Sequence, residues 1–267
     1  MKSKNQTISV IDQLGREIII PILPQRIISV VPSQTELLFD LGRGDSVIGV
    51  TLFCIHPEEA KSKTKIGGTK KLKLEKIVSL NPDLIIANKE ENDQSQIEWL
   101  AERFPVWISD IKDMDNALSM IRAVGEMTGR MEQANSIISS IYESFSKLKP
   151  GSPRRTLYLI WRSPYMSVGS DTFISHIMQR CGFVSVLDSE TRYPELTENQ
   201  IKTLNPELVL LSSEPYPFKE KHISELKNLL PNAKIMLVDG EMFSWYGSRL
   251  VEASSYLKKL LDNEAMR

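Results

Sequence analysis

Short apolar runs alternate with amphipathic segments in both halves of the chain. In the first half the apolar runs lie at 26–31, 47–50, 84–87 and 106–108, and the helical patterns between them include 74–80 and 94–103. In the second half the runs lie at 156–161, 184–187, 208–211 and 235–238, and the helical patterns at 172–180, 198–204, 218–229 and 248–261. Strands that alternate with helices are typical of mostly parallel sheets. The pattern therefore predicts two α/β halves.

The first apolar run leads directly into a helix signal. Ser33 and Glu36 have the spacing of a capping box, and Gly42 fits the end of the same helix. The sequence predicts a helix in which Ser33 is the N-cap residue.

The segment 114–149 contains no proline and has apolar residues at helical spacing. An unbroken helix of this length spans about 54 Å. Gly125 and Gly129 each weaken a helix interior by about 1 kcal/mol, so two helices broken near Thr128 are the alternative. Residues 150–153 (PGSP) end the segment. We expect an N-terminal lobe at 1–113, a bridging helix at 114–150 and a C-terminal lobe at 151–267.

A short repeat relates the two halves. Residues 80–86 (LNPDLII) recur as 204–210 (LNPELVL) at an offset of 124. Proline disfavours helix in the residue before it, so each copy predicts a helix that stops, turns and enters a buried strand.

Charge and cysteine content narrow the classes of partner. The 33 basic and 34 acidic residues leave a net charge of −1, which lacks the basic footprint of a nucleic-acid binder. Cys54 and Cys181 lie far apart without a C-x-x-C motif. The N-terminus lacks the apolar core of a signal peptide, and no apolar run approaches the about 20 residues of a membrane-spanning helix. We expect no nucleic-acid partner and no membrane span.

Several motifs together resemble the class III periplasmic solute-binding proteins, or helical-backbone metal receptors, which carry iron-siderophores, haem or cobalamin. The motifs are 24–36 (PQRIISVVPSQTE), 47–50 (VIGV), 66–68 (IGG), 74–77 (LEKI) and 81–85 (NPDLI). Residues 33–38 (SQTELL) and 249–252 (RLVE) look most like the cobalamin-receptor branch. The resemblance implies two Rossmann-like lobes with mostly parallel sheets, joined by one long backbone helix, with the ligand in a cleft between the lobes. It also implies a monomer that is not an enzyme, has no intrinsic cofactor, and delivers an iron or cobalt chelate to an ABC transporter permease.

In that family an acidic residue on each lobe docks onto arginines of the permease. Glu75 matches this position in the first lobe. The offset of 124 leads to Asn199 in the second lobe, with Glu198 one residue earlier. The alternative role of both glutamates is a favourable interaction with the helix N-terminus, about 0.3–1 kcal/mol each.

Candidate ligand-binding residues follow the predicted strands, because open α/β sheets bind ligands beyond the carboxyl ends of their strands. They are Ser33, Gln34, Thr35, Phe53, His56, Trp161, Arg162, Tyr165, Trp245, Tyr246 and Arg249. Aromatic rings with arginines suit a flat or carboxylate-bearing ligand. The alternative for the tryptophans among them is packing. Trp99 and Trp107 fall in helix and strand patterns and are expected in the core.

Cys54 and His56, with Glu58 or Glu59, form the only cluster of metal-ligand residue types in the sequence, and Cys54 and His56 are weak candidates for direct metal binding. A turn or capping role for a histidine beside proline is the favoured alternative.

Two other functions remain open at this stage. An enzyme could bind a nucleotide in Rossmann-like lobes, but the chain lacks the G-x-G-x-x-G, P-loop, G-x-S-x-G and H-E-x-x-H motifs, which argues against this class. A twin-Rossmann nucleotide-sugar transferase remains the enzymatic alternative. A cytoplasmic ligand sensor or sequestering protein of the same fold is the other. The expected location is the periplasm or cell surface if a signal was trimmed, and otherwise the cytoplasm.

Overall fold

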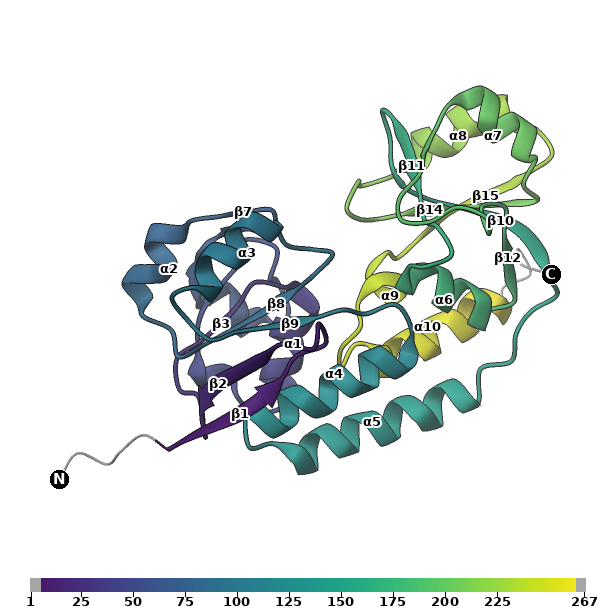
Figure 1. Cartoon of the computed structure of the whole chain (residues 1–267). Coiled ribbons are helices and arrows are strands. Elements are labelled where there is room, and N and C mark those ends of the chain that lie inside the picture. Colours follow the sequence, from purple (N-terminus) through teal and green to yellow (C-terminus); the bar gives the residue numbers. More distant parts are fainter. Residues whose placement is uncertain (1–5, 263–267) are drawn as a thin grey trace. The chain divides into compact units, whose positions relative to one another are not determined.

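The computed structural model describes residues 6–262, which form two compact α/β units (Figure 1). The described part of the first unit contains residues 6–111, Asp115–Tyr142 and Tyr246–Arg249. The second contains Lys112–Met114, Glu143–Trp245 and residues 250–262. The lobe limits expected from the sequence, 113 and 150, stay a prediction. Among residues 6–262, no helix is both long and apolar enough to cross a membrane.

A five-stranded parallel sheet forms the core of the first unit, in the order β5-β4-β3-β8-β9. Its strands are β3 (Ile27–Ser29), β4 (Val47–Val50), β5 (Thr64–Lys65), β8 (Leu84–Asn88) and β9 (Val106–Ser109). The unit also contains α1 (Pro32–Asp40), α2 (Leu74–Leu80), α3 (Gln94–Ala101), the short pair β6 (Gly67–Gly68) and β7 (Lys71–Leu72), and 3₁₀ turns at Gly44–Ser46 and Glu58–Ser62. Every residue of β8 is buried, which is typical of a strand covered on both faces. The predicted parallel sheet is confirmed.

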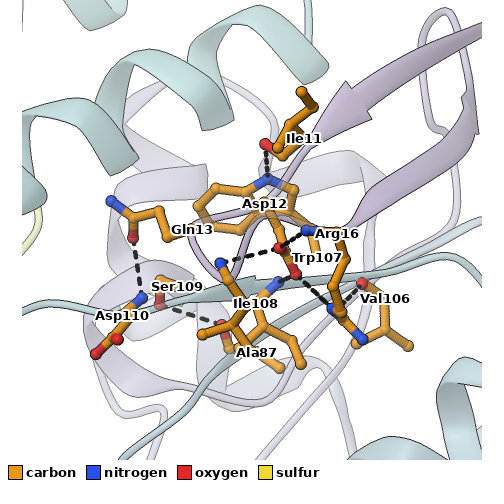
Figure 2. A network of polar contacts seen from close by, with 11 residues as sticks. Ile11, Asp12, Gln13, Arg16, Ala87, Val106, Trp107, Ile108, Ser109 and Asp110 are labelled. Atoms are coloured by element: carbon orange, nitrogen blue, oxygen red, sulfur yellow. Dashed lines mark hydrogen bonds and ion pairs between the residues drawn. The ribbon is translucent and has the colours of Figure 1, made fainter.

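A hairpin of β1 (Thr7–Ile11) and β2 (Glu17–Pro21) forms a separate two-stranded sheet beside it, and the sequence patterns did not predict it. Its turn docks on the edge strand β9 (Figure 2). The backbone N–H of Gln13 donates to the carbonyl of Ile108 at 3.1 Å, and Trp107 Nε1 donates to the carbonyl of Ile11 at 3.3 Å. Asp12 is buried and pairs with Arg16 at 2.7 Å. The turn therefore satisfies part of an edge that would otherwise present unpaired backbone groups.

The second unit has a sheet of the same kind. Strands β12 (Phe183–Ser185), β10 (Arg154–Trp161), β14 (Leu208–Ser212) and β15 (Lys234–Val238) pair in parallel, and the short strands β11 (Tyr165–Ser167) and β13 (Glu195–Leu196) add antiparallel pairing. The helices are α6 (Phe173–Arg180), α7 (Glu198–Leu204), α8 (Glu220–Leu229), α9 (Glu241–Ser244) and α10 (Leu250–Asp262). Inward-facing residues of the sheet, such as Leu157, Val209 and Ile235, form its core.

The expected single bridging helix is wrong in its continuity. The segment forms α4 (Met114–Met127) and α5 (Met131–Ser146), as in the two-helix alternative. Gly129 has a φ of +66°, a left-handed conformation that ends α4. A Cβ atom on Gly125 would lie 2.4 Å from the Cβ of Ala134, so the start of α5 passes close to α4 at this glycine. The boundary between the two units falls within α5.

The repeated sequence has the same backbone conformation in both units. Asn81 ends α2 at φ 43° and ψ 64°, and Asn205 ends α7 at φ 43° and ψ 61°. Both are left-handed, a conformation that asparagine tolerates better than most residues. Each turn leads into the strand that pairs in parallel with the first strand of its sheet, β3 or β10. The predicted architecture of the repeat is therefore confirmed.

An arginine supports each copy of this turn. Arg26 donates to the last carbonyl of α2, and Arg155 Nη2 donates to the carbonyl of Leu204 at 2.6 Å. The backbone N–H of each arginine donates to an acidic side chain after the turn, Asp83 at 2.9 Å and Glu207 at 2.9 Å. The helix C-termini, which leave carbonyls without intrahelical partners, are capped in the same way in both units.

Candidate functional site

The carboxyl ends of the parallel strands in the first unit carry a buried polar network. Ser109 at the end of β9 accepts hydrogen bonds from Gln34 Nε2 and from Asn88 Nδ2, the latter at 3.0 Å. Asn92 donates to the carbonyl of Val30 at 3.1 Å. These bonds fix the loops that follow β3, β8 and β9, and so give the carboxyl edge of the sheet a defined surface.

The start of α1 differs from the predicted capping box. The N-cap residue is Val31, which has no side-chain cap, and Pro32 is the first helical residue. Ser33 therefore lies inside the first turn, and the predicted N-cap role is wrong. The physical reason is that proline is favoured at the first helical position, which places the helix start two residues earlier.

The first turn of α1 leaves polar atoms available. Ser33 Oγ and Gln34 Oε1 are buried and have no hydrogen-bond partner within residues 6–262. Thr35 is engaged: its hydroxyl lies 2.9 Å from the carbonyl of Val31 and 3.1 Å from Cys54 Sγ. Of the three candidates, Ser33 and Gln34 retain hydrogen-bonding capacity, whereas Thr35 supports the fold.

The loop after β4 presents an apolar surface. Phe53 is 58% exposed, and Leu52 and Ile55 are exposed beside it. Cys54 is fully buried between these residues, and burial raises the pKa of its thiol. His56 is half-buried. Within the part of the chain that the structure describes, no group of three or more His, Cys, Asp or Glu residues is arranged to hold a metal ion, so direct metal binding by Cys54 and His56 gains no support.

Two aromatic residues that follow α9 donate hydrogen bonds to carboxylates. Trp245 Nε1 donates to Glu214 at 3.0 Å, and Tyr246 Oη donates to Glu91. Trp245 and Tyr246 are both buried, each 6% exposed. Burial raises the pKa of Glu214, although bonds from Ser244 and Trp245 oppose this. These two aromatic residues hold the loop in place, and their expected contact with a ligand stays a prediction.

Arg249 forms a bidentate ion pair with Glu36 of α1. Arg249 Nε lies 2.9 Å from Glu36 Oε2, and Arg249 Nη2 bonds the other carboxylate oxygen. Their side chains are 9% and 14% exposed. Burial raises the pKa of Glu36 despite the nearby guanidinium group. The pair joins the segment Tyr246–Arg249 to α1. Arg249 thus binds a carboxylate of the protein itself, and its expected contact with a ligand stays a prediction.

The second unit presents an exposed aromatic residue at the end of its central strand. Trp161, the last residue of β10, is 39% exposed and contacts Tyr216 edge-on at 5.7 Å between ring centroids. Arg162 follows it and pairs with Glu225 at 2.7 Å. Tyr165 and Tyr216 lie near Arg162, and they raise the pKa of its guanidinium group. Trp161, Arg162 and Tyr165 therefore lie near one another, and their contact with a ligand stays a prediction.

Three residues behind this surface were not singled out from the sequence. Tyr216, Phe218 and His222 pack edge to face, with centroid distances of 4.8, 5.5 and 5.4 Å. These three residues form one cluster with Trp161 and Arg162. A proline-rich loop, 213–217 (SEPYP), and the first turn of α8 bring the three together. An aromatic pair two residues apart in such a loop was the available signal.

The two predicted docking glutamates are both exposed in first turns of helices. Glu75 lies in the first turn of α2 and Glu198 in the first turn of α7. The α7 start is already capped by Thr197 and Gln200. Glu198 is therefore not needed as a side-chain cap, although it still has the favourable position near the helix dipole.

Comparison with known proteins shows the family to which this chain belongs. A periplasmic binding protein family model matches residues 27–229, and the chain belongs to that family. A vitamin B12-binding protein of Pectobacterium carotovorum subsp. carotovorum (strain PC1) is 26% identical over 243 residues, covering 88% of this chain and 87% of the relative. Membership makes the chain a solute-binding protein and not an enzyme, as the resemblance implied.

Solved structures show the same two-lobed fold. The periplasmic vitamin B12 binding protein of Vibrio cholerae is similar with a TM-score of 0.76 and 22% identity, covering 91% of this chain and 98% of that protein. The petrobactin-binding protein of Bacillus subtilis is similar with a TM-score of 0.79 and 15% identity, covering 97% of this chain and all of that protein, 100%. At these identities the likeness establishes the fold.

Proposed function

We propose that this chain is the solute-binding component of an ABC importer and carries a metal-bearing small molecule: cobalamin, an iron-siderophore or haem. Relatives named for vitamin B12 and petrobactin support this class of ligand. The observation that carries the proposal is the exposed indole of Trp161 beside Arg162 at the end of β10. A flat surface next to a fixed cation suits a large planar or aromatic chelate with anionic groups.

The same proposal gives roles to residues of the first unit. Phe53 offers an exposed ring, and Ser33 and Gln34 have buried oxygens that find no hydrogen-bond partner among residues 6–262. A ligand with polar groups would satisfy such atoms, whose desolvation without a partner costs about 1–3 kcal/mol each. We therefore propose Phe53, Ser33 and Gln34 as ligand contacts. Five further residues predicted from the sequence remain proposed ligand contacts: His56, Tyr165, Trp245, Tyr246 and Arg249.

Equilibrium dialysis with cyanocobalamin, haemin and a ferric tris-catecholate tests the proposed ligand class. We expect saturable binding of one of the three, and a Trp161→Ala loss of about 2 kcal/mol, or more than tenfold in Kd, if this ring is a central anchor. The matched control is Trp99→Ala, because Trp99 is not among the proposed ligand contacts. Trp99 lies on α3, and the guanidinium carbon of Arg103 lies 3.8 Å from the centroid of its ring. If none of the chelates binds, the proposed function is wrong.

We also propose that Glu75 and Glu198 dock onto the permease. Both side chains are exposed at helix starts, where they remain accessible to cationic side chains of a partner. The double variant E75Q/E198Q should reduce chelate uptake by cells at least tenfold while leaving the Kd unchanged, because the salt-bridging charges are removed and the ligand surface is not. Glu102→Gln is the control, since this exposed glutamate lies after α3. Normal uptake by the double variant, with only a lower melting temperature, would reduce both residues to helix stabilisation.

The location and the oligomeric state complete the proposal. The matching family and the vitamin B12 binding protein of Vibrio cholerae are called periplasmic, which supports a protein that acts outside the cytoplasm. We propose that it acts as a monomer. Cell fractionation with light scattering of the purified chain tests both. A cytoplasmic fraction that retains all of the protein would favour a ligand sensor or sequestering protein instead.

A further inference from the structure

Arg162 is held by side chains from three separate segments. Tyr165 of β11 and Tyr216 of the loop before α8 lie near its guanidinium group and raise its pKa, and Glu225 of α8 pairs with it at 2.7 Å. The Arg162 side chain keeps 33% of its surface exposed. The cation is therefore fixed in direction but still open to a ligand, which is how arginine recognises a carboxylate or another anionic oxygen with high specificity.

His222 holds Tyr216 and the start of α8 together. Its ring is 2% exposed, and the backbone N–H of Lys219 donates to Nδ1 at 2.8 Å. Nδ1 must be unprotonated to accept this bond, so the neutral ring carries its proton on Nε2. Nε2 lies 3.3 Å from the hydroxyl of Tyr216. Neutral His222 thus links the cap of α8 to Tyr216, which contacts Trp161 and lies near Arg162.

We propose that His222 and Tyr216 are positioning residues for Arg162, and that protonation of His222 loosens this arrangement, so that the second unit binds an anionic chelate at neutral pH and releases it in acid. The inference rests on the proposed function for its ligand. The geometry alone supplies the switch: a ring with two used nitrogens cannot gain a proton without losing the bond to Nδ1.

The charges around the ring give the direction of the effect. Glu225 and Lys221 of α8 and Arg162 at the end of β10 face His222, and Tyr216 contacts it from the preceding loop. A protonated ring would repel the Arg162 guanidinium group and compete with it for Glu225. Arg162 would lose a carboxylate partner and the support of Tyr216 at the same time.

Burial lowers the pKa of His222 below its ordinary value of 6.5. A group whose pKa is lower in the folded state stabilises the fold above its unfolded pKa, and this contribution is lost as pH falls toward the folded value. The neutral ring is therefore the form present at pH 7, and the change must occur on the acid side of about 6.5.

A ligand-free experiment tests the switch independently of any chelate. The emission of Trp161, taken as the difference between the wild type and Trp161→Phe, is followed from about pH 7.5 to 5 in the full chain. We expect one step below about pH 6.5, because Tyr216 contacts both Trp161 and His222. In His222→Asn the step should vanish, since asparagine retains an acceptor for Lys219 N–H but does not titrate. A flat wild-type profile, or a step that persists in His222→Asn, would overturn the proposal.

Binding of haemin and its dimethyl ester tests the role of Arg162. Haemin carries two carboxylates, and the ester removes their charge. We expect the wild-type Kd for haemin to rise about tenfold between about pH 7.5 and 5.5, while His222→Asn shows no such rise and the ester shows little in either protein. Tyr216→Phe should weaken haemin more than the ester at neutral pH, with exposed Tyr142→Phe as the control. Equal losses for both ligands would mean that Tyr216 only supports the fold.

The two proposals fail in different ways. If neither haemin nor its ester binds, a ferric tris-catecholate, which is also anionic, replaces haemin and cyanocobalamin replaces the ester. If no chelate binds at any pH, the proposed function is wrong and the ligand part of the inference falls with it. If a chelate binds with the same pH profile in the wild type and His222→Asn, the proposed function stands and the inference is wrong.

Discussion

Replacing Arg249 with methionine should destabilise the first unit by leaving Glu36 buried without its partner. Both side chains are largely buried, at 9% and 14% exposure, and they share two hydrogen bonds. Removing one partner of such a pair costs about 3–5 kcal/mol, and methionine fills most of the volume, so we expect the lower end, about 3 kcal/mol at pH 7.5. Urea denaturation in a W161F/W245F background, where only Trp99 and Trp107 of the first unit report, measures this loss.

The deficit should depend on pH. Burial already raises the pKa of Glu36, and loss of the guanidinium group removes the contacts that lower it. A raised folded pKa means that the fold is favoured at low pH and loses this contribution as pH rises, so the deficit of Arg249→Met should shrink toward about pH 5.

The double variant E36M/R249M provides the control. Replacing a whole buried ion pair with apolar residues is often neutral or stabilising, so we expect it to recover at least half of the loss. A cost below about 1 kcal/mol for Arg249→Met, equal at both pH values, would refute the idea that this pair is buried and coupled.

Three further results are expected. Arg155→Ala should lower the stability of the second unit by about 1 kcal/mol, measured by urea denaturation, because the carbonyl of Leu204 loses its donor; no change would show that water caps α7 equally well. Gly247→Ala should destabilise the first unit by about 1–3 kcal/mol in the same assay, because the new Cβ would lie 2.8 Å from the carbonyl oxygen of Ser33; a neutral effect would mean that the segment shifts easily. Burial raises the pKa of Cys181 to about 12 and also raises that of Cys54, so neither thiol should react with a disulfide reagent at about pH 8 until the chain is unfolded; rapid labelling of the native protein would contradict this.

Local patterns predicted the regular elements well. The helix at Glu198–Leu204 has the expected bounds, and the repeated Asn-Pro turns have the same conformation at Asn81 and Asn205. Such features depend on residues that are neighbours in sequence, so periodicity and proline placement report them. The break between α4 and α5 was less well determined, because Gly129 signals a left-handed residue only when its surroundings require one.

The candidate site was predicted by position but not by partner. The sequence named Trp161, Arg162 and Tyr165 as candidate ligand contacts because they follow one strand, and in the structure they lie near one another. It did not predict Tyr216 and His222, which come from a loop and a helix more than fifty residues later. The docking of the hairpin turn at Asp12 on β9 was not predicted for the same reason, because β9 lies far along the chain from this turn.

By itself the sequence determined two α/β halves, their repeated turns and the family of binding proteins to which the chain belongs, because these depend on short motifs and on periodicity. Only the tertiary structure decided that Arg249 pairs with Glu36. The same holds for the hydrogen bonds that Trp245 and Tyr246 donate to Glu214 and Glu91, and for the position of His222 near Arg162. An arginine or an aromatic residue after a strand has the same local signature whether it faces a ligand or a buried carboxylate. Whether such a residue faces a ligand or a buried carboxylate depends on which distant segment folds against it. The residues around it in the sequence do not identify that segment.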